Sequence, residues 1–266
     1  MTLSSRAPIG AHALREPRGT PDPALTLGGE EPAAWRTSVM RRVSVSWLTP
    51  PGDVDDAVRF VPTLPAFDEA FAAFARGTLF AGARGVVAVE DLWPGTELRM
   101  ADGRLARVVW RGSTVIVPRG DGQDPAMSRL TRIPAEALGL GRPYQDLVLG
   151  PHARLVMRRP GMRRLTGQEV AAIPAADFVD GVGIVEVSPP SPVEVFHLAF
   201  DRHERLLANG VEVESYHPGP LHALPLRGET MQPFLACFPH VTDLAGFGAP
   251  ALPRLRLRDL DLIGVA

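Results

Sequence analysis

Residues 71–98, FAAFARGTLFAGARGVVAVEDLWPGTEL, contain the pattern that decides the fold. A short apolar lead precedes Gly77 and Thr78, and an acidic pair, Glu90 and Asp91, precedes a Pro-Gly turn. Between them, apolar residues flank a Gly-rich turn, which predicts a β-hairpin. The acidic pair sits on adjacent residues, which point in opposite directions in a strand, so it predicts a turn rather than a pair of acid–base carboxylates.

The stretch LPAFDEAFAAFARG, residues 64–77, has a helical period instead. Phe67, Phe71 and Phe74 fall at i, i+4 and i+7, which places them on one helical stripe. Pro65 suits the first turn, where its missing N–H has no intrahelical partner. We therefore predict a short amphipathic helix that runs through this segment and packs on a sheet.

Further upstream, residues 41–62 alternate apolar and polar side chains on both sides of TPPGD. This pattern predicts two strands joined by a turn, with Val43, Val45 and Trp47 on one face of the first strand and Val58 and Phe60 on the second. We take residues 39–76, the strand pair and the helix, as one unit. Residues 1–38 are rich in Pro, Gly and charge without any period, and we predict that they are disordered.

The segment from Thr78 to about Gly219 predicts short strands and turns. Asp102-Gly103 and Asn209-Gly210 are strong hairpin signals because both residue pairs tolerate the positive φ angles of tight turns. Regular short strands without long helices predict a mostly β domain. Residues 220–266 form a Pro-rich C-terminal extension, whose end, LPRLRLRDLDLIGVA, is compatible with an edge strand or a binding tail.

Composition narrows the function classes. The formal net charge of −2 provides no global field for nucleic acid or an anionic membrane, so neither is an expected partner, whereas a protein partner of unknown kind is compatible with the sequence. A single cysteine, Cys237, excludes a disulfide framework within the chain and a multi-cysteine metal site. No signal peptide or membrane-spanning run is recognisable, so a cytoplasmic location is the default expectation, although non-classical secretion stays open.

Three segments in order carry a family resemblance: residues 71–98, DLVLGPHARLVM at 146–157, and FHLAFDRHERLLANGVEVESYHPG at 196–219. Together they resemble the Hint domain, the hedgehog/intein-type module, and most closely its bacterial branch. The resemblance implies a horseshoe-shaped β fold over residues 77–219. It also implies self-processing chemistry, in which a cysteine or serine at the start of the domain attacks the preceding carbonyl.

Carried over by position, the resemblance implies that the catalytic set is degenerate. The opening nucleophile falls on Ala73, whose methyl group cannot attack a carbonyl. The motif that supplies the amide-protonating histidine falls on Gly150 and Ala153. His152 lies one residue away, which in a strand would point it to the opposite face.

Other positions of the family site hold polar residues. They are Thr78, His197, Asp201 and His203. At strand spacing, the last three would share one face and could form a residual acid–base or metal site, or they could support a turn and local hydrogen bonds. We expect no metal and no cofactor, because no further ligand is placed. The domain end has His217 but not the His-Asn pair that closes an intein.

A second argument rests on the helix. If the helix includes Ala73, the peptide bond before it belongs to a regular hydrogen-bond ladder and is not the strained, accessible amide that an acyl shift requires. The sequence thus favours a Hint-type protein without autocatalytic cleavage, acting as a scaffold or interaction module rather than as an enzyme. Two alternatives remain: an active autoprocessing domain with another nucleophile, such as Thr78 or Ser188, and a hydrolase built on Cys237 and His240.

Overall fold

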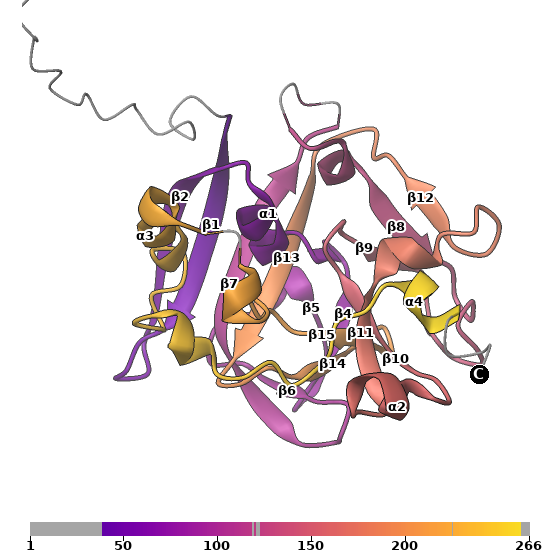
Figure 1. Cartoon of the computed structure of the whole chain (residues 1–266). Coiled ribbons are helices and arrows are strands. Elements are labelled where there is room, and N and C mark those ends of the chain that lie inside the picture. Colours follow the sequence, from indigo (N-terminus) through magenta and orange to yellow (C-terminus); the bar gives the residue numbers. More distant parts are fainter. Residues whose placement is uncertain (1–38, 119, 121–122, 225, 262–266) are drawn as a thin grey trace, which may run out of the picture.

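The structure, a computed structural model, describes residues 39–118, 120, 123–224 and 226–261. The segment predicted to be disordered, 1–38, and the last residues of the C-terminal extension therefore lie outside the described residues. The described chain forms one antiparallel β-sheet system of 15 strands with few, short helices (Figure 1). The predicted mostly β class is confirmed.

The strands run in the order β11-β10-β15-β14-β4-β6-β7-β13-β3-β9-β8-β12, with β1 attached to β7, β2 attached to β1, and β5 attached to β4. Their bounds are β1 Met40–Leu48, β2 Val54–Pro62, β3 Phe74–Ala75, β4 Leu79–Gly82, β5 Gly85–Ala88, β6 Glu97–Arg99, β7 Leu105–Ile116, β8 Leu130–Ile133, β9 Leu147–Leu149, β10 Arg154–Arg158, β11 Val170–Pro174, β12 Val185–Val187, β13 Val193–Phe200, β14 Arg205–Ala208 and β15 Val211–Glu214. The helices are α1 Pro65–Phe71, α2 Met162–Thr166, α3 Met231–Leu235 and α4 Leu257–Asp261. None of these helices is long and apolar enough to cross a membrane.

The predicted hairpins are present. β4 pairs with β5 in the opening stretch, β6 pairs with β7 across Asp102-Gly103, and β14 pairs with β15 across Asn209-Gly210. The glycines and Asn209 of these last two turns have positive φ angles, as tight hairpin turns require. The predicted pair β1–β2 is also present, and β1 continues onto β7, so this pair extends the main sheet.

The helix prediction was right about the start and wrong about the end. α1 begins at Pro65 but ends at Phe71, and Phe74 lies in strand β3, paired with β13 and β9. Phe67 and Phe71 are buried as a helical stripe, whereas Phe74 enters the core from a strand. The chain leaves the helix at Ala72, because hydrogen bonds to the sheet are available to the residues that follow.

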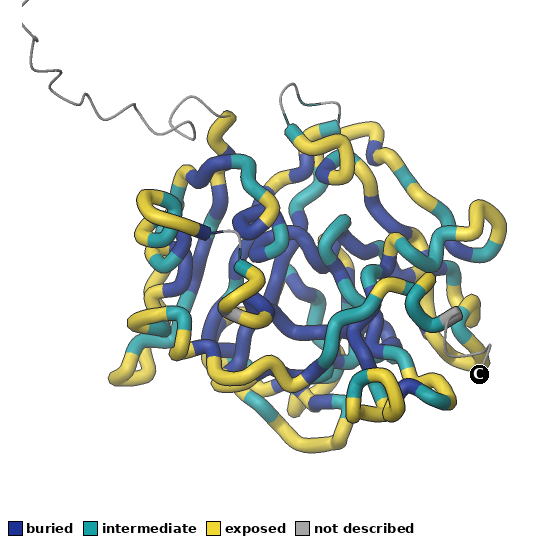
Figure 2. The backbone as a smooth tube through the Cα atoms, in the orientation of Figure 1, coloured by how far each residue is buried: buried dark blue, intermediate teal, exposed yellow. Residues whose placement is uncertain are grey.

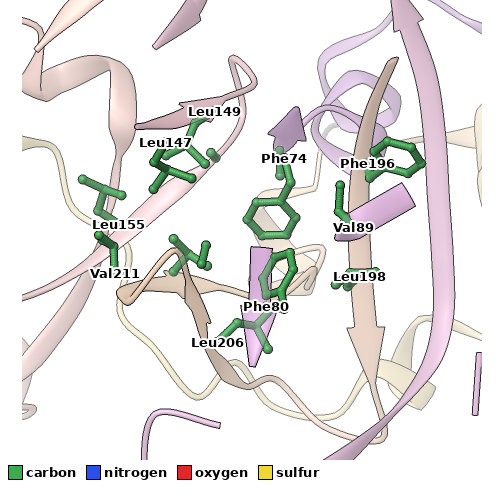
Figure 3. Close-up of a cluster of buried hydrophobic side chains, with 14 of the residues drawn as sticks. Phe74, Phe80, Val89, Leu147, Leu149, Leu155, Phe196, Leu198, Leu206 and Val211 are labelled. Atoms are coloured by element: carbon green, nitrogen blue, oxygen red, sulfur yellow. The ribbon is translucent and has the colours of Figure 1, made fainter. Parts of the chain in front are cut away.

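Buried residues lie along the strands in the interior, whereas many connecting turns are exposed (Figure 2). Two large apolar clusters fill this interior. The first lies within the β domain, where Phe74 and Phe80 meet edge to face with ring centroids 5.1 Å apart (Figure 3). The second lies under β1 and α1, where the C-terminal extension contributes Phe234, Phe238 and Phe247 against Trp110. The extension therefore packs as part of the core. Its end forms neither an edge strand nor a free tail within the described residues, but one parallel bridge at Arg254 followed by α4.

Candidate functional site

The peptide bond between Ala72 and Ala73 is the centre of the candidate site. Ala73 N–H donates to the Phe196 carbonyl over 3.1 Å, and the Ala72 carbonyl accepts from His152 N–H over 3.0 Å. Both alanines are fully buried. The expectation that a helical ladder holds this bond is wrong, because the bond follows the end of α1; nevertheless both of its polar groups are engaged, here by the sheet.

The next contacts show how tightly the two chain segments approach each other. Gly150 N–H donates to the Ala73 carbonyl over 2.7 Å. A Cβ atom at Gly150 would lie 2.4 Å from the Ala72 carbonyl oxygen, so the backbone leaves no room for a serine or threonine there. Ala153 is buried in the same apolar cluster as Ala73. Two methyl groups and a bare glycine thus occupy the positions where the family resemblance expects a nucleophile, a histidine and a hydroxyl.

His152 contacts this site through its backbone N–H. It lies in the turn before β10, between Gly150 and the buried Ala153. Burial, partly offset by Glu69 and reinforced by Arg154, lowers the pKa of its imidazole to about 4. The ring is therefore neutral at neutral pH.

Thr78 is buried, and its hydroxyl has a structural partner. Oγ1 donates to the Ala75 carbonyl over 2.7 Å and also lies 3.4 Å from the Val148 carbonyl. These contacts stabilise the chain at the end of β3 and commit the hydroxyl proton to a backbone acceptor.

The three residues expected on one face, His197, Asp201 and His203, do not converge. His197 lies in β13 with its ring edge against Phe74 and Tyr216, at centroid distances of 5.5 and 5.2 Å. Asp201 lies in an exposed bend after β13 ends. His203 is buried beyond this bend in a separate cluster. The expected alternation fails because the strand stops before Asp201.

His197 has a defined structural role. Its Nδ1 lies 3.0 Å from the Glu69 carbonyl in α1, so Nδ1 carries the proton and donates it. Burial lowers the pKa of the imidazole, and the hydrogen bond to the Glu69 carbonyl raises it. The effect of burial is larger, so the pKa is about 3. The neutral ring therefore links β13 to the helix that precedes the candidate peptide bond.

His203 and His217 stack with ring centroids 4.8 Å apart. His203 Nδ1 accepts from Ala251 N–H over 3.0 Å, and its Nε2 lies 3.1 Å from Glu214 Oε1. His217 Nδ1 accepts from Gly219 N–H, so its Nε2 carries the proton and donates to the Gly248 carbonyl over 3.2 Å. Burial and the adjacent His203 lower the pKa of His217 to about 4. Both histidines therefore use a ring nitrogen to bind the C-terminal extension.

Sequence reasoning missed the charged cluster beside these histidines. The Glu214 carboxylate accepts from Arg254 Nε over 2.9 Å and lies 3.5 Å from Arg154 Nη1. Burial raises its pKa, but His203, Arg254 and Arg154 outweigh this effect and lower the value to about 2. Arg154 also reaches Glu69 in α1 over 3.3 Å. The signal was hard to detect because these residues are scattered along the chain, and the period-2 pattern of β15 does not single out Glu214 as buried.

Cys237 and His240 do not form a nucleophile–base pair. The Cys237 thiol lies 3.4 Å from the Pro233 carbonyl, and burial raises its pKa to about 12, so it stays protonated. His240 lies among aromatic rings, and burial lowers its pKa to about 4. Ser188 is exposed after β12. Within the described part of the chain, no group of three His, Cys, Asp or Glu residues could hold a metal ion.

The chain was compared with protein families, with curated proteins and with solved structures. The family model described as the Hint domain matches residues 72–220. Among solved structures, the bacterial intein-like domain from Clostridium thermocellum is similar with 13% identity and a TM-score of 0.36, over 55% of this chain and 99% of that one. The AceL NrdHF class 3 split intein, a splice-inactive variant, is similar with 10% identity and a TM-score of 0.37, over 54% and 97%. No curated protein matches.

Proposed function

The chain belongs to the Hint domain family, and we propose that it is a member without autocatalytic cleavage that acts as a scaffold or interaction module. One observation supports this most strongly: Ala73 occupies the nucleophile position, and a methyl group has no lone pair with which to attack the Ala72 carbonyl. Membership of the family accounts for the fold and for the type of reaction, self-cleavage. What we propose is that this chain has lost that reaction.

The surroundings of the peptide bond support the same conclusion. An acyl shift needs an amide that can distort, yet here the N–H and C=O groups on both sides of the bond are hydrogen-bonded within a buried sheet. The histidine position holds Ala153, so no side chain there protonates a leaving nitrogen. Two buried histidines of the domain, His203 and His217, bind the extension instead of facing a reactive group.

The extension contributes to the proposed scaffold. Its segment around Arg254 covers Glu214 and the stacked histidines, and residues near Phe234 fill the second apolar cluster. In this interpretation, residues 220–261 turn the end of a processing domain into a closed part of the core. A chain without a cleavable bond and with a packed end would present a stable surface to a partner.

The direct test is intact mass of purified protein, followed over days with and without hydroxylamine, which traps esters and thioesters. We expect wild-type protein to keep its full mass. An Ala73→Cys variant and an Ala73→Cys/Ala153→His variant restore the two missing groups in turn, and Ala75→Cys is the matched control because it adds a buried thiol two residues away.

Cleavage of wild-type protein would overturn the proposal, and the new terminus would identify the nucleophile, including Thr78 or Ser188. Cleavage before residue 73 in the restored variants alone would support it and assign the loss to those two positions. If no variant is cleaved, we would conclude that the close approach of Gly150 to the Ala72 carbonyl also prevents cleavage. Hydrolysis of added thioester or ester substrates that disappears in Cys237→Ala would instead support the hydrolase.

A further inference from the structure

Strand β2 is an unusually long free edge of the sheet. Its nine residues pair with β1 and with no other described strand. The other strands that pair with one named strand only, β5, β11 and β12, have four, five and three residues. An unpaired edge of this length presents a row of backbone donors and acceptors that can pair with another strand. Figure 1 shows β2 with β1 at one end of the molecule.

The side chains of β2 make this edge suited to association. On the outer face, Val54, Val58 and Phe60 are exposed by 45%, 44% and 66%. On the inner face, Asp55 is exposed and Arg59 is half-buried, and neither forms an ion pair with any other described residue. Instead, Asp55 Oδ1 accepts from Asp56 N–H over 2.9 Å and Arg59 Nη1 donates to the Val58 carbonyl over 3.2 Å, and pairing with a second strand would replace these two bonds. The outer face thus exposes three apolar side chains and, between Val54 and Val58, Asp56. The inner face has one charge of each sign, four residues apart, that forms no ion pair with a described residue.

We propose that two copies of the chain associate through β2, which pairs antiparallel with β2 of the second copy around a two-fold axis at Ala57. In this register Asp55 lies opposite Arg59 of the second copy, and this charge pair occurs twice because the interface is isologous. Val54 lies opposite Phe60 of the second copy, also twice. The sheet then continues from one copy into the other, and the long edge disappears.

Charge selects this register over its neighbours. An axis perpendicular to the sheet keeps each face on its own side, so residues pair only with residues of the same parity. Moving the axis to Asp56 would place that carboxylate opposite itself, and moving it to Val58 would leave Arg59 opposite Ala57. Like charges directly opposite destabilise a strand pair and opposite charges stabilise it, so the axis at Ala57 is favoured.

The occupant follows from the same pattern. A strand that carries Asp55 and Arg59 at symmetric distances from its centre is complementary to itself, which a foreign strand need not be. The backbone edge and the contacts between Val54 and Phe60 supply attraction, Asp56 lies opposite Val58 of the second copy, and the two charge pairs supply register and specificity.

The test is sedimentation of the full chain over a concentration series. We expect a monomer–dimer equilibrium for wild type. Asp55→Arg and Arg59→Asp each place like charges opposite one another and should weaken dimerisation about tenfold or more. The double variant Asp55→Arg/Arg59→Asp restores both pairs and should regain wild-type dimerisation. An equimolar mixture of the two single variants should form a heterodimer, because each then faces its opposite charge.

Asp53→Arg is the matched control, since it makes the same charge change in the exposed turn before β2 and should leave dimerisation unchanged. Circular dichroism of each variant checks that the fold is kept, and all substituted side chains lie at the surface edge. A wild-type chain that stays monomeric throughout would overturn the proposal. So would a dimer that the single variants leave intact, or one that the double variant fails to restore.

Discussion

At the scale of single residues, Glu214 is a buried carboxylate with three basic neighbours. Its side chain is buried and surrounded by Arg254, Arg154 and His203. We expect Glu214→Gln to lower the free energy of unfolding by about 3–5 kcal/mol, because Arg154 and Arg254 lose their buried counter-charge and keep only the more exposed Glu69. Urea unfolding at neutral pH measures this change.

The neighbouring Glu212 supplies the control. It lies on the same strand, is only half-buried and pairs with Arg205 over 3.2 Å. Glu212→Gln should change the free energy of unfolding by about 1 kcal/mol or less. Equal losses in the two variants would show that the charged cluster around Glu214 adds no particular stability.

Gly150 is a position where one added carbon atom should change the stability of the fold. Because an added Cβ would lie 2.4 Å from the Ala72 carbonyl oxygen, Gly150→Ser should destabilise the fold by about 1–3 kcal/mol and should not create a processing site. Gly183→Ser is the control, since its Cβ would approach only the flexible Asp180 carboxylate, at 3.3 Å. Thermal unfolding compares the two, and a Gly150→Ser protein as stable as wild type would show that the Ala72 segment yields easily.

At the scale of elements, short sequence motifs correctly predicted structures formed by neighbouring residues, such as hairpins. Asp102-Gly103 and Asn209-Gly210 each determine a hairpin by their own turn chemistry, and the structure has both. The end of α1 was mispredicted because it is set from a distance. The Phe196 carbonyl and the His152 N–H bond to residues 72 and 73, and these sheet contacts prevail over a helical period that would extend to Phe74.

The candidate site also has features that the sequence shows directly and features that only the folded structure shows. The hypothesis of a degenerate site rests on Ala73 and Ala153, two single positions that the sequence shows directly once the family resemblance is recognised, and it stays a prediction. The cluster of Glu69, Arg154, Glu214 and Arg254 could not be predicted, because its members come from four separated segments and only the folded chain brings them together.

The docking of the C-terminal extension gives a prediction at this scale. Arg254 donates to Glu214 and, over 2.6 Å, to the His217 carbonyl, while the adjacent backbone bridges Ala172 in β11. Arg254→Met should therefore loosen this segment locally. In hydrogen exchange, the amide of Leu255, which donates to the Ala172 carbonyl, should exchange at least tenfold faster than in wild type.

Arg256 is the matched control for this loosening. Its side chain is 57% exposed and contacts Asp177 over 2.7 Å, so Arg256→Met should change the exchange of Leu255 little. If both variants exchange alike, or neither differs from wild type, apolar packing by the extension rather than the buried arginine holds the segment in place.

At the scale of the whole molecule, buried neutral histidines make the fold sensitive to acid. The pKa of His197 falls from 6.5 to about 3 and that of His217 to about 4 on folding, mainly through burial. Below pH 6.5 the unfolded chain therefore binds protons that the folded chain does not, and stability declines as the pH falls toward these folded-state values. Glu214, lowered from 4.5 to about 2, adds a further loss below about pH 4.5.

The contribution of one histidine is separable. As the pH falls from the pKa of such a histidine in the unfolded chain to its pKa in the folded chain, the free energy of unfolding should decrease by about 1.4 kcal/mol per pH unit. His197→Gln keeps a donor near the Glu69 carbonyl but does not titrate, so its curve of stability against pH should be shallower by about that slope between pH 6 and pH 4, whatever its stability at neutral pH. His222→Gln, at an exposed position, should keep the wild-type slope. A slope unchanged in His197→Gln would mean that protonation of other groups drives acid unfolding, and that the link between β13 and α1 tolerates a charged ring.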